Sequence, residues 1–357
     1  MAIQDRKSLA EATVSITGRR LSLPEGPIFK LQRAAESDYE LGEFRAWAGY
    51  KDLGSEAATA GLAHFQHVVS FAATDAAGRT GIHAHFAHAH IVIPTSGRGV
   101  FSYDGRVTEA VPGTVIAQHG GTIHDQFAYS FAVGSGAGTP LSVEPVSDAA
   151  AQSFGFLELF VPRCFANVEV VPPEAVSEAD QRTAWDHPYH AAGAFFLQDA
   201  DDPDAAYRPA AGRANLEARD SGTWGPSGSL VATWIVRPAT DAAARPEVSI
   251  EAPGETGGID ILFMAKGSAS FPRGDGEPVR LGEGDTLTCS QGLVGDPFDV
   301  SPDMRLVKIF IAARAQQLRE RTPGEIAQVE ALGPAIITRR EVRPEGDMRP
   351  VNFLRDA

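Results

Sequence analysis

Short apolar runs alternate with clusters of Gly, Pro, Asp and Ser along most of this chain. Runs of this kind include residues 91–93, 114–117, 259–263 and 306–311. Apolar runs of such length, bounded by turn-forming residues, predict β-strands. Asp104-Gly105 and Asp275-Gly276 predict hairpin turns, because glycine adopts positive φ without steric cost. The pattern therefore predicts an all-β protein.

The same pattern occurs twice. The segment 45–54 corresponds to 213–222 at a shift of 168 residues, and each copy continues into an apolar strand at 65–72 or 229–236. Further on, Gly97 matches Gly267 at a shift of 170, and Gly113 matches Gly284 at a shift of 171. Short loop insertions explain this drift. A chain of 357 residues is long enough for two cores, so we predict one all-β domain written twice.

The repeat sets the predicted domain boundaries. Two short helices are expected, at 174–184 in the linker and at 323–331 in the C-terminal segment. The N-terminal arm is expected to pack across the second domain or a partner chain. The predicted segments are an arm at 1–40, a first domain at 41–171, a linker at 172–212, a second domain at 213–321, and a C-terminal helix and tail at 322–357.

Histidines are concentrated in the first copy. Six of the ten histidines lie between residues 81 and 124. His83 and His85 stand two residues apart, and this spacing on a strand directs both rings to one face. Neutral imidazole is a good ligand for Fe, Ni, Cu, Mn and Zn. The clustering therefore predicts a transition-metal site. The six are His83, His85, His88, His90, His119 and His124.

The spacing of these histidines resembles the two motifs of the cupin superfamily. His83-Ala-His85, four residues, His90, six residues and Gly97 resemble the first motif. Gly113, five residues, His119, one residue, Gly121, two residues and His124 resemble the second. Three positions depart from the family pattern, with histidine for glutamate at 90, histidine for proline at 119 and alanine for asparagine at 128. The resemblance implies a bicupin, with two double-stranded β-helix (jelly-roll) barrels in tandem.

The resemblance implies a ligand set for one divalent transition metal. His83, His85 and His124 fall on ligand positions. His90, at the usual glutamate position, is either a fourth ligand or an inward-facing acid/base or supporting group. Gln126 shares the strand face of His124 and is a candidate to hydrogen-bond a bound oxygen atom, so His90 and Gln126 are the candidate catalytic residues.

Other histidines carry weaker expectations. His88 is expected in a loop, and His119 is expected either to flank the site or to lie outside the barrel. His64 and His67 stand three residues apart, hence on opposite strand faces, and we expect His67 to be the one that faces the cavity. The linker residues His187 and His190 are expected to be solvated.

The second copy lacks these histidines. The repeat shifts place Pro253, Glu255, Asp260 and Gly295 where the first copy has His83, His85, His90 and His124. Two carboxylates without a third partner rarely hold a transition metal against water. The second domain is therefore predicted to be metal-free.

A fold does not determine a function, and the cupin fold is found with many. The resemblance to quercetinase-like and all-histidine cupins implies a dioxygenase that uses O2 to cleave a C–C bond in an enolic, phenolic or β-dicarbonyl small molecule, with Fe(II) expected ahead of Ni, Mn, Cu or Zn. Nearby phenylalanines, including Phe65 and Phe101, suit an aromatic substrate. The alternatives are a metal-dependent isomerase, lyase or cyclase that uses the ion as a Lewis acid, and a storage-type cupin.

Charge and composition narrow the partners. A net charge of −15 disfavours a nucleic-acid partner, and no apolar run is long enough for a membrane span. The polar N-terminus lacks the apolar core of a signal peptide. Two cysteines, Cys164 and Cys289, are too few for a disulfide framework and are expected to be buried. These features predict a cytoplasmic protein whose partners are a small substrate and O2, with a homo-oligomer left open.

Overall fold

The computed structural model is almost entirely β-structure. The only α-helix among the described residues is α2 (Ser55–Ala58), and two short 3-10 turns cover Ala34–Glu36 and Ala313–Gln317. None of the described helices is long and apolar enough to cross a membrane. The described residues are 19–20, 23–41, 48–70, 83–85, 87–97, 99–103, 106–119, 124–127, 131–133, 143–145, 154–162, 167–171, 195–198, 206–240, 246–251, 254, 257–274, 276–317, 319–320 and 335–336. The helices predicted at 174–184 and 323–331 lie outside them.

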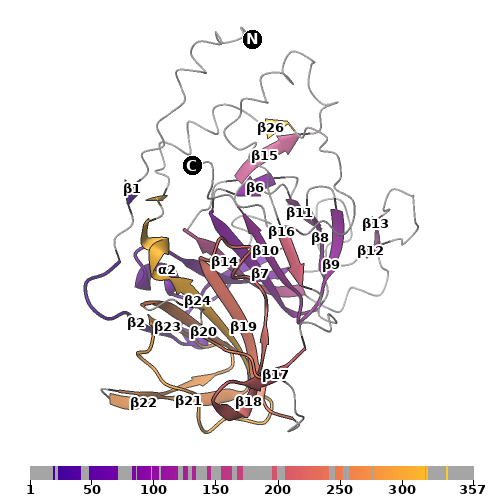
Figure 1. Ribbon diagram of the computed structural model, residues 1–357. Helices are drawn as coiled ribbons and strands as arrows, with labels where there is room; N and C mark the ends of the chain where they lie inside the picture. Colours follow the sequence, from indigo (N-terminus) through magenta and orange to yellow (C-terminus); the bar gives the residue numbers. More distant parts are fainter. Residues whose placement is uncertain are drawn as a thin grey trace.

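The first copy folds into two sheets, which together form the first barrel (Figure 1). Its seven-stranded sheet has the order β16 (Phe195–Gln198), β10 (Val115–His119), β7 (Ala89–Ser96), β14 (Phe154–Val161), β5 (His64–Ser70), β4 (Ala48–Asp52), β3 (Glu40–Leu41). Its six-stranded sheet has the order β26 (Ala335–Ile336), β15 (Asn167–Val171), β6 (His83–His85), β11 (His124–Phe127), β8 (Gly99–Tyr103), β9 (Arg106–Ala110).

The second copy forms the second barrel. Its seven-stranded sheet has the order β17 (Arg208–Ala210), β18 (Arg213–Asp220), β19 (Val231–Pro238), β24 (Arg305–Ala312), β20 (Gly258–Lys266), β23 (Thr286–Ser290), β2 (Phe29–Gln32). A hairpin of β21 (Ser268–Arg273) and β22 (Gly276–Gly282) lies below this sheet in the view of Figure 1. Two further strand pairs are β1 (Arg19–Arg20) with β25 (Arg319–Glu320), and β12 (Phe131–Val133) with β13 (Val143–Pro145).

The two large sheets repeat each other strand by strand. The central orders β10-β7-β14-β5-β4 and β23-β20-β24-β19-β18 are the same. Each sheet also takes an edge strand from outside its own copy of the repeat. The arm strand β2 pairs with β23 of the second barrel, and the linker strand β16 pairs with β10 of the first. The arm thus completes the second barrel, and the linker completes the first.

The local turns repeat as well. The Asp52 carboxylate accepts a hydrogen bond from the Gly54 amide at 3.0 Å, and the Asp220 carboxylate accepts one from Gly222 at 2.8 Å. The matched glycines Gly97 and Gly267 have φ of 67° and 71°. Glycine is favoured at both positions because other residues seldom adopt this conformation. The repeat read from the sequence is thus present in the backbone.

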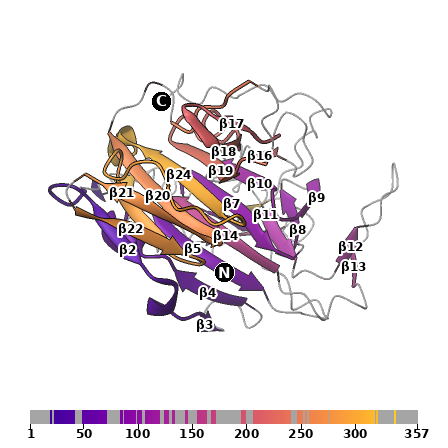
Figure 2. The same cartoon turned by 90° about the horizontal axis from the view of Figure 1, so that it is seen from below.

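One apolar core lies between the barrels, where the two large sheets lie side by side (Figures 1 and 2). It contains Phe65, Ile91 and Leu159 from the first half and Ile261 and Ile309 from the second. The rings of Phe65 and Phe263 meet edge to face at 6.2 Å. Each barrel also has its own interior core. Since alternate residues of a strand face opposite sides, each large sheet has one face on the shared core and one face inside its barrel.

Candidate metal centre

Three histidines converge inside the first barrel. His85 on β6, His90 on β7 and His124 on β11 each offer a ring nitrogen, and these nitrogens all lie within 4.8 Å of one another. His90 and His124 are buried, and His85 is partly buried. The ring centroid of His85 is 4.9 Å from that of His90 and 4.7 Å from that of His124. Neutral imidazoles from three strands suit a divalent transition metal, so the donor set fits the predicted ion.

Phe160 holds two of these rings in place. Its ring is stacked on His90, with centroids 4.3 Å apart and planes 8° apart. It also meets His85 edge to face at 5.0 Å. Phe160 is directly opposite His90 on the neighbouring strand β14. An aromatic wall on this side limits the rotation of both imidazoles and keeps water away from them.

Both ring nitrogens of His90 have a partner. Nε2 donates a hydrogen bond to the Glu158 carboxylate at 2.8 Å, and Nδ1 accepts one from the Gln118 side-chain amide. In this arrangement Nε2 is directed at Glu158 and Nδ1 at Gln118. To bind an ion, His90 must give up one of the two hydrogen bonds. The position therefore remains compatible with both roles expected for His90, ligand and acid/base group.

Glu158 is the candidate site residue that the sequence reasoning missed. Its carboxylate accepts hydrogen bonds from His90 and, at 2.5 Å, from Gln66. Burial acts to raise the pKa of Glu158. The hydrogen bond and electrostatic attraction of His90, the hydrogen bond from Gln66 and the attraction of His64 outweigh it and hold this pKa below its ordinary value. The centre thus has a negative charge beside its imidazoles. The signal was present, because Glu158 is the one acidic residue in the apolar strand 154–161.

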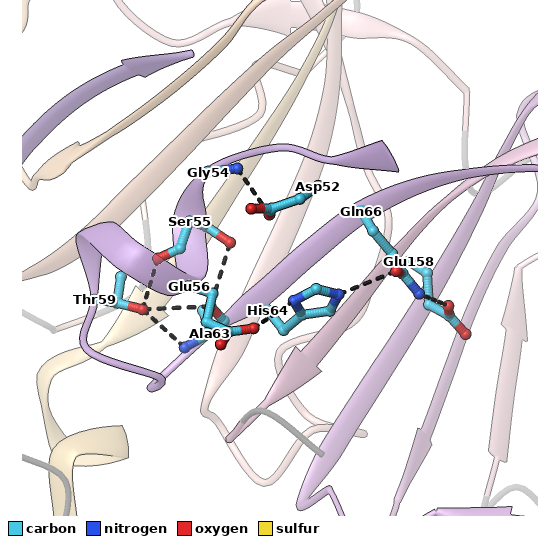
Figure 3. Close-up of polar contacts among 9 residues, drawn as sticks. All are labelled: Asp52, Gly54, Ser55, Glu56, Thr59, Ala63, His64, Gln66 and Glu158. Atoms are coloured by element: carbon cyan, nitrogen blue, oxygen red, sulfur yellow. Dashed lines mark hydrogen bonds and ion pairs between the residues drawn. The ribbon is translucent and has the colours of Figure 1, made fainter. Parts of the chain in front are cut away.

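The polar network continues away from the histidine cluster (Figure 3). The Gln66 side-chain oxygen is 3.0 Å from His64 Nε2, and His64 Nδ1 is 2.8 Å from the Glu56 carboxylate. Burial lowers the pKa of His64, but the contacts with Glu56 and Gln66 dominate and raise it overall. The network therefore runs from α2 across β5 and β14 to His90.

The expectation that His67 faces the cavity is wrong. His64 is the residue that joins the interior network, while His67 lies on the opposite face of β5. There the ring of His67 is hydrogen-bonded to Tyr39 at 2.8 Å and Thr95 at 2.9 Å, and it lies 6.1 Å from the ring of Phe263 in the second half. The two residues do lie on opposite faces, but the sequence alone did not show which face was internal.

Some of the remaining residues singled out in the sequence are described by the structure, and the others are not. The backbone pairing of His83 with His124 places His83 beside the cluster. The side chains of His83, His119 and Gln126 lie outside the described part of the chain, as do Cys164, His187 and His190. His88 is exposed in a bend, as expected. Cys289 is buried.

The phenylalanines contribute less to the site than their positions in the sequence suggested. Phe65 packs in the core between the barrels rather than near the histidines. Phe101 belongs to the interior core of the first barrel, with ring centroids 5.9 Å from Phe154 and 6.1 Å from Phe156. The aromatic residue that contacts the cluster is Phe160.

The second barrel has a different interior at the corresponding positions. Strand register equates His90 with Asp260, because each lies opposite the equivalent phenylalanine, Phe160 or Phe310. The same register equates Glu158 with Lys308. Among the described residues, the three-histidine cluster is the only group that could hold a metal. The described part of the second barrel therefore has no equivalent of this cluster, while Pro253 and Glu255 lie outside the description.

Comparison with known proteins gave structural neighbours only. No family model matches the chain, and no curated protein matches it. Similar solved structures include the bacterial pirin YhhW in complex with nickel(II) from Escherichia coli, at 11% identity and a TM-score of 0.45, covering 80% of this chain and 99% of that one. Procruciferin, an 11S globulin from Brassica napus, has 10% identity and a TM-score of 0.47, with coverage of 83% and 86%. An oxalate decarboxylase variant from B. subtilis has 12% identity and a TM-score of 0.42, with coverage of 79% and 77%. These neighbours are cupin-fold proteins.

Proposed function

We propose that this protein is a metal-dependent dioxygenase that uses O2 to cleave a C–C bond in an enolic, phenolic or β-dicarbonyl small molecule. The observation that carries the proposal is the convergence of His85, His90 and His124 inside one barrel, with their ligand atoms within 4.8 Å of one another. Fe(II) is the expected ion. Ni, Mn, Cu or Zn are the other candidates, because imidazole also binds these metals.

The three histidines would hold the ion, and His83 is the candidate for a further ligand. A bound divalent ion would supply positive charge for an anionic enolate or phenolate and open positions for substrate and O2. The chain's own residues do the rest. Phe160 fixes the imidazole planes and excludes water, and Glu158 orients His90 through its Nε2 proton.

Glu158 would also reduce the effective positive charge of the bound ion. A wholly neutral ligand set leaves the full charge of the ion available to the substrate, whereas a carboxylate hydrogen-bonded to one ligand raises the basicity of that ligand. If Gln118 releases Nδ1 to the ion, Glu158 continues to accept the proton on Nε2. This carboxylate–histidine–metal arrangement is common in metalloenzymes, and it explains why a charged carboxylate is retained inside the barrel.

A second candidate function rests on the same hydrogen bond. A carboxylate paired with a histidine can hold and return a proton, as an isomerase, lyase or cyclase would require beside a Lewis-acidic ion. The His90–Glu158 pair favours this alternative over a storage role, because a storage barrel has no use for a buried acid/base pair.

Oxygen consumption distinguishes the two reactions. Untagged protein is purified, its metals are measured by elemental analysis, and it is then offered a panel of enolic, phenolic and β-dicarbonyl compounds with and without O2. The dioxygenase predicts O2 uptake in proportion to substrate loss and no turnover without oxygen. Equal turnover with and without O2 would contradict the dioxygenase and favour the isomerase or lyase.

A further inference from the structure

The interior of the second barrel contains three polar side chains at positions that match the metal centre. Asp260 on β20 corresponds to His90, Lys308 on β24 to Glu158, and Trp234 on β19 to Gln66. Trp234 lies directly across from Lys308 on the neighbouring strand, and Lys308 lies directly across from Leu262. All three polar residues therefore face the inside of this barrel.

These side chains have hydrogen-bonding capacity that the described residues do not use. The indole Nε1 of Trp234 and the Oδ1 atom of Asp260 are buried, and neither has a hydrogen-bond partner among the described residues. The Lys308 ammonium is 3.7 Å from Asp260 Oδ1, which is longer than a hydrogen bond. It also lies 5.9 Å from the centre of the Trp234 ring. Two donors and one acceptor thus lie on the same face of the sheet, and no hydrogen bond joins them.

Such an arrangement is costly unless something completes it. Buried polar groups in folded proteins are nearly always paired, and each exception needs an explanation. Burial raises the pKa of Asp260, although the Lys308 ammonium opposes the shift. The neighbouring Cys289 adds no charge, since burial and then Asp260 raise the pKa of its thiol to about 12. The charges of Asp260 and Lys308 offset each other, but Asp260 Oδ1 and Trp234 Nε1 still lack hydrogen-bond partners among the described residues.

We propose that the second barrel binds a small carboxylate that carries an adjacent hydrogen-bond donor, either a hydroxyl or an ammonium group. The ligand carboxylate accepts from Lys308 and from the Trp234 N–H, while its own donor bonds to Asp260. Phe310 on β24 and Leu262 on β20 lie on the same face of the sheet and provide an apolar wall. The Lys308 side chain is 17% exposed, so solvent reaches part of it.

The proposal does not depend on the metal centre, and binding titrations test it with four probes. Glycolate carries a carboxylate and a hydroxyl, and glycine a carboxylate and an ammonium. Acetate lacks the donor, and ethylene glycol lacks the carboxylate. Binding of each probe to the full chain is followed by calorimetry and by the fluorescence of its tryptophans. Glycolate or glycine should bind about tenfold or more tightly than acetate, and ethylene glycol should not bind. The preference between glycolate and glycine identifies the donor.

Variants locate the site. Lys308→Met should weaken binding about tenfold or more, and Asp260→Asn should reduce the better ligand to the level of acetate. Trp234→Phe retains the ring while removing the N–H, and it should weaken binding severalfold. The double variant Asp260→Asn/Lys308→Met removes both charges together, so it should stay folded and fail to bind.

A control separates this site from the metal centre. His124→Ala, which alters only the first barrel, should bind the probes as the unaltered protein does. Loss of binding in His124→Ala would assign the ligand to the metal centre and overturn the proposal. The proposal also fails if neither glycolate nor glycine binds at millimolar concentration, or if the folded double variant still binds.

Discussion

The two barrels have the same strands in the same register and opposite chemistry inside. On the inward face of the first large sheet, one row across the strands contains His64, Phe160, His90 and Gln118, where the second sheet has Ala232, Phe310, Asp260 and Cys289. The next row contains Gln66, Glu158, Val92 and Ile116, where the second sheet has Trp234, Lys308, Leu262 and Leu287. Of the matched positions in these two rows, only Phe160 and Phe310 have the same residue in both barrels.

The difference teaches which parts of the sequence maintain the fold. The apolar positions in these rows remain apolar in both copies, and both copies keep their positive-φ glycines and the Asp–Gly turns. The polar positions differ between the copies, with His90 and Glu158 in the first and Asp260 and Lys308 in the second. The carboxylate is therefore on β14 in the first barrel but on β20, the equivalent of β7, in the second. Packing and turn geometry thus specify the barrel, whereas the inward polar residues specify what each barrel does.

Removing a ligand of the first barrel is expected to have the largest effect. His85→Ala and His124→Ala each delete a donor, so each should lose metal and activity together while the barrel stays folded. His90→Ala should do the same if His90 is a ligand. The barrel has its own apolar core, so we expect its fold not to depend on the metal. His83→Ala is expected to behave in the same way. Elemental analysis, circular dichroism and a rate measurement check these variants, and full metal occupancy in any of them would remove that residue from the ligand set.

Glu158→Gln tests the carboxylate that supports His90. The variant keeps the size and hydrogen-bonding shape of the side chain but removes its charge, so metal affinity should fall by about 10- to 100-fold. Glu217→Gln is the matched control, since Glu217 is also a buried carboxylate but is paired with Arg237 in the second half. Competition with a chelator measures both affinities. Equal affinity in the two variants would mean that Glu158 has no role at the centre.

Two substitutions separate the possible roles of His90. If His90 is a ligand, His90→Glu should retain metal, because a carboxylate also coordinates such ions, but the added charge should weaken binding of an anionic substrate. If His90 instead transfers a proton, His90→Gln should keep its metal and lose its turnover. Metal content and rate are measured for both variants. Unaltered behaviour of both would show that His90 has neither role.

A smaller, pH-dependent effect is expected where the barrels meet. Burial, and then the Lys51 charge, lower the pKa of His67 to about 4 from its ordinary 6.5. The unfolded chain therefore binds more protons than the native state between these values, and stability should fall as pH falls from about 6.5 to 4, by at most about 3 kcal/mol. Urea unfolding across this range checks the slope, which should flatten in His67→Gln. An unchanged slope would assign the effect to other groups.

The sequence predicted the parts of the structure that local patterns determine. The strands, the repeat with its matched glycines, and a cluster of histidines in the first barrel follow from periodicity and motif spacing. The predicted hairpin turns Asp104-Gly105 and Asp275-Gly276 include residues outside the described part of the chain. The role of Glu158 could not be predicted, because it depends on β14 lying between β5 and β7 in the sheet. The choice of His64 over His67 required knowing which face of β5 packs on the second barrel. The pairing of the arm strand β2 with the second barrel, and of the linker strand β16 with the first, is likewise a tertiary feature with no local signal.

The most direct test of the central claim is to locate the metal itself. A crystal of the full chain, purified with its own metal, is measured at the absorption edge of that metal. The account predicts one anomalous peak per chain, between His85, His90 and His124 in the first barrel, and no peak beside Asp260. A peak in the second barrel, or a metal held in the first barrel away from these three histidines, would contradict it.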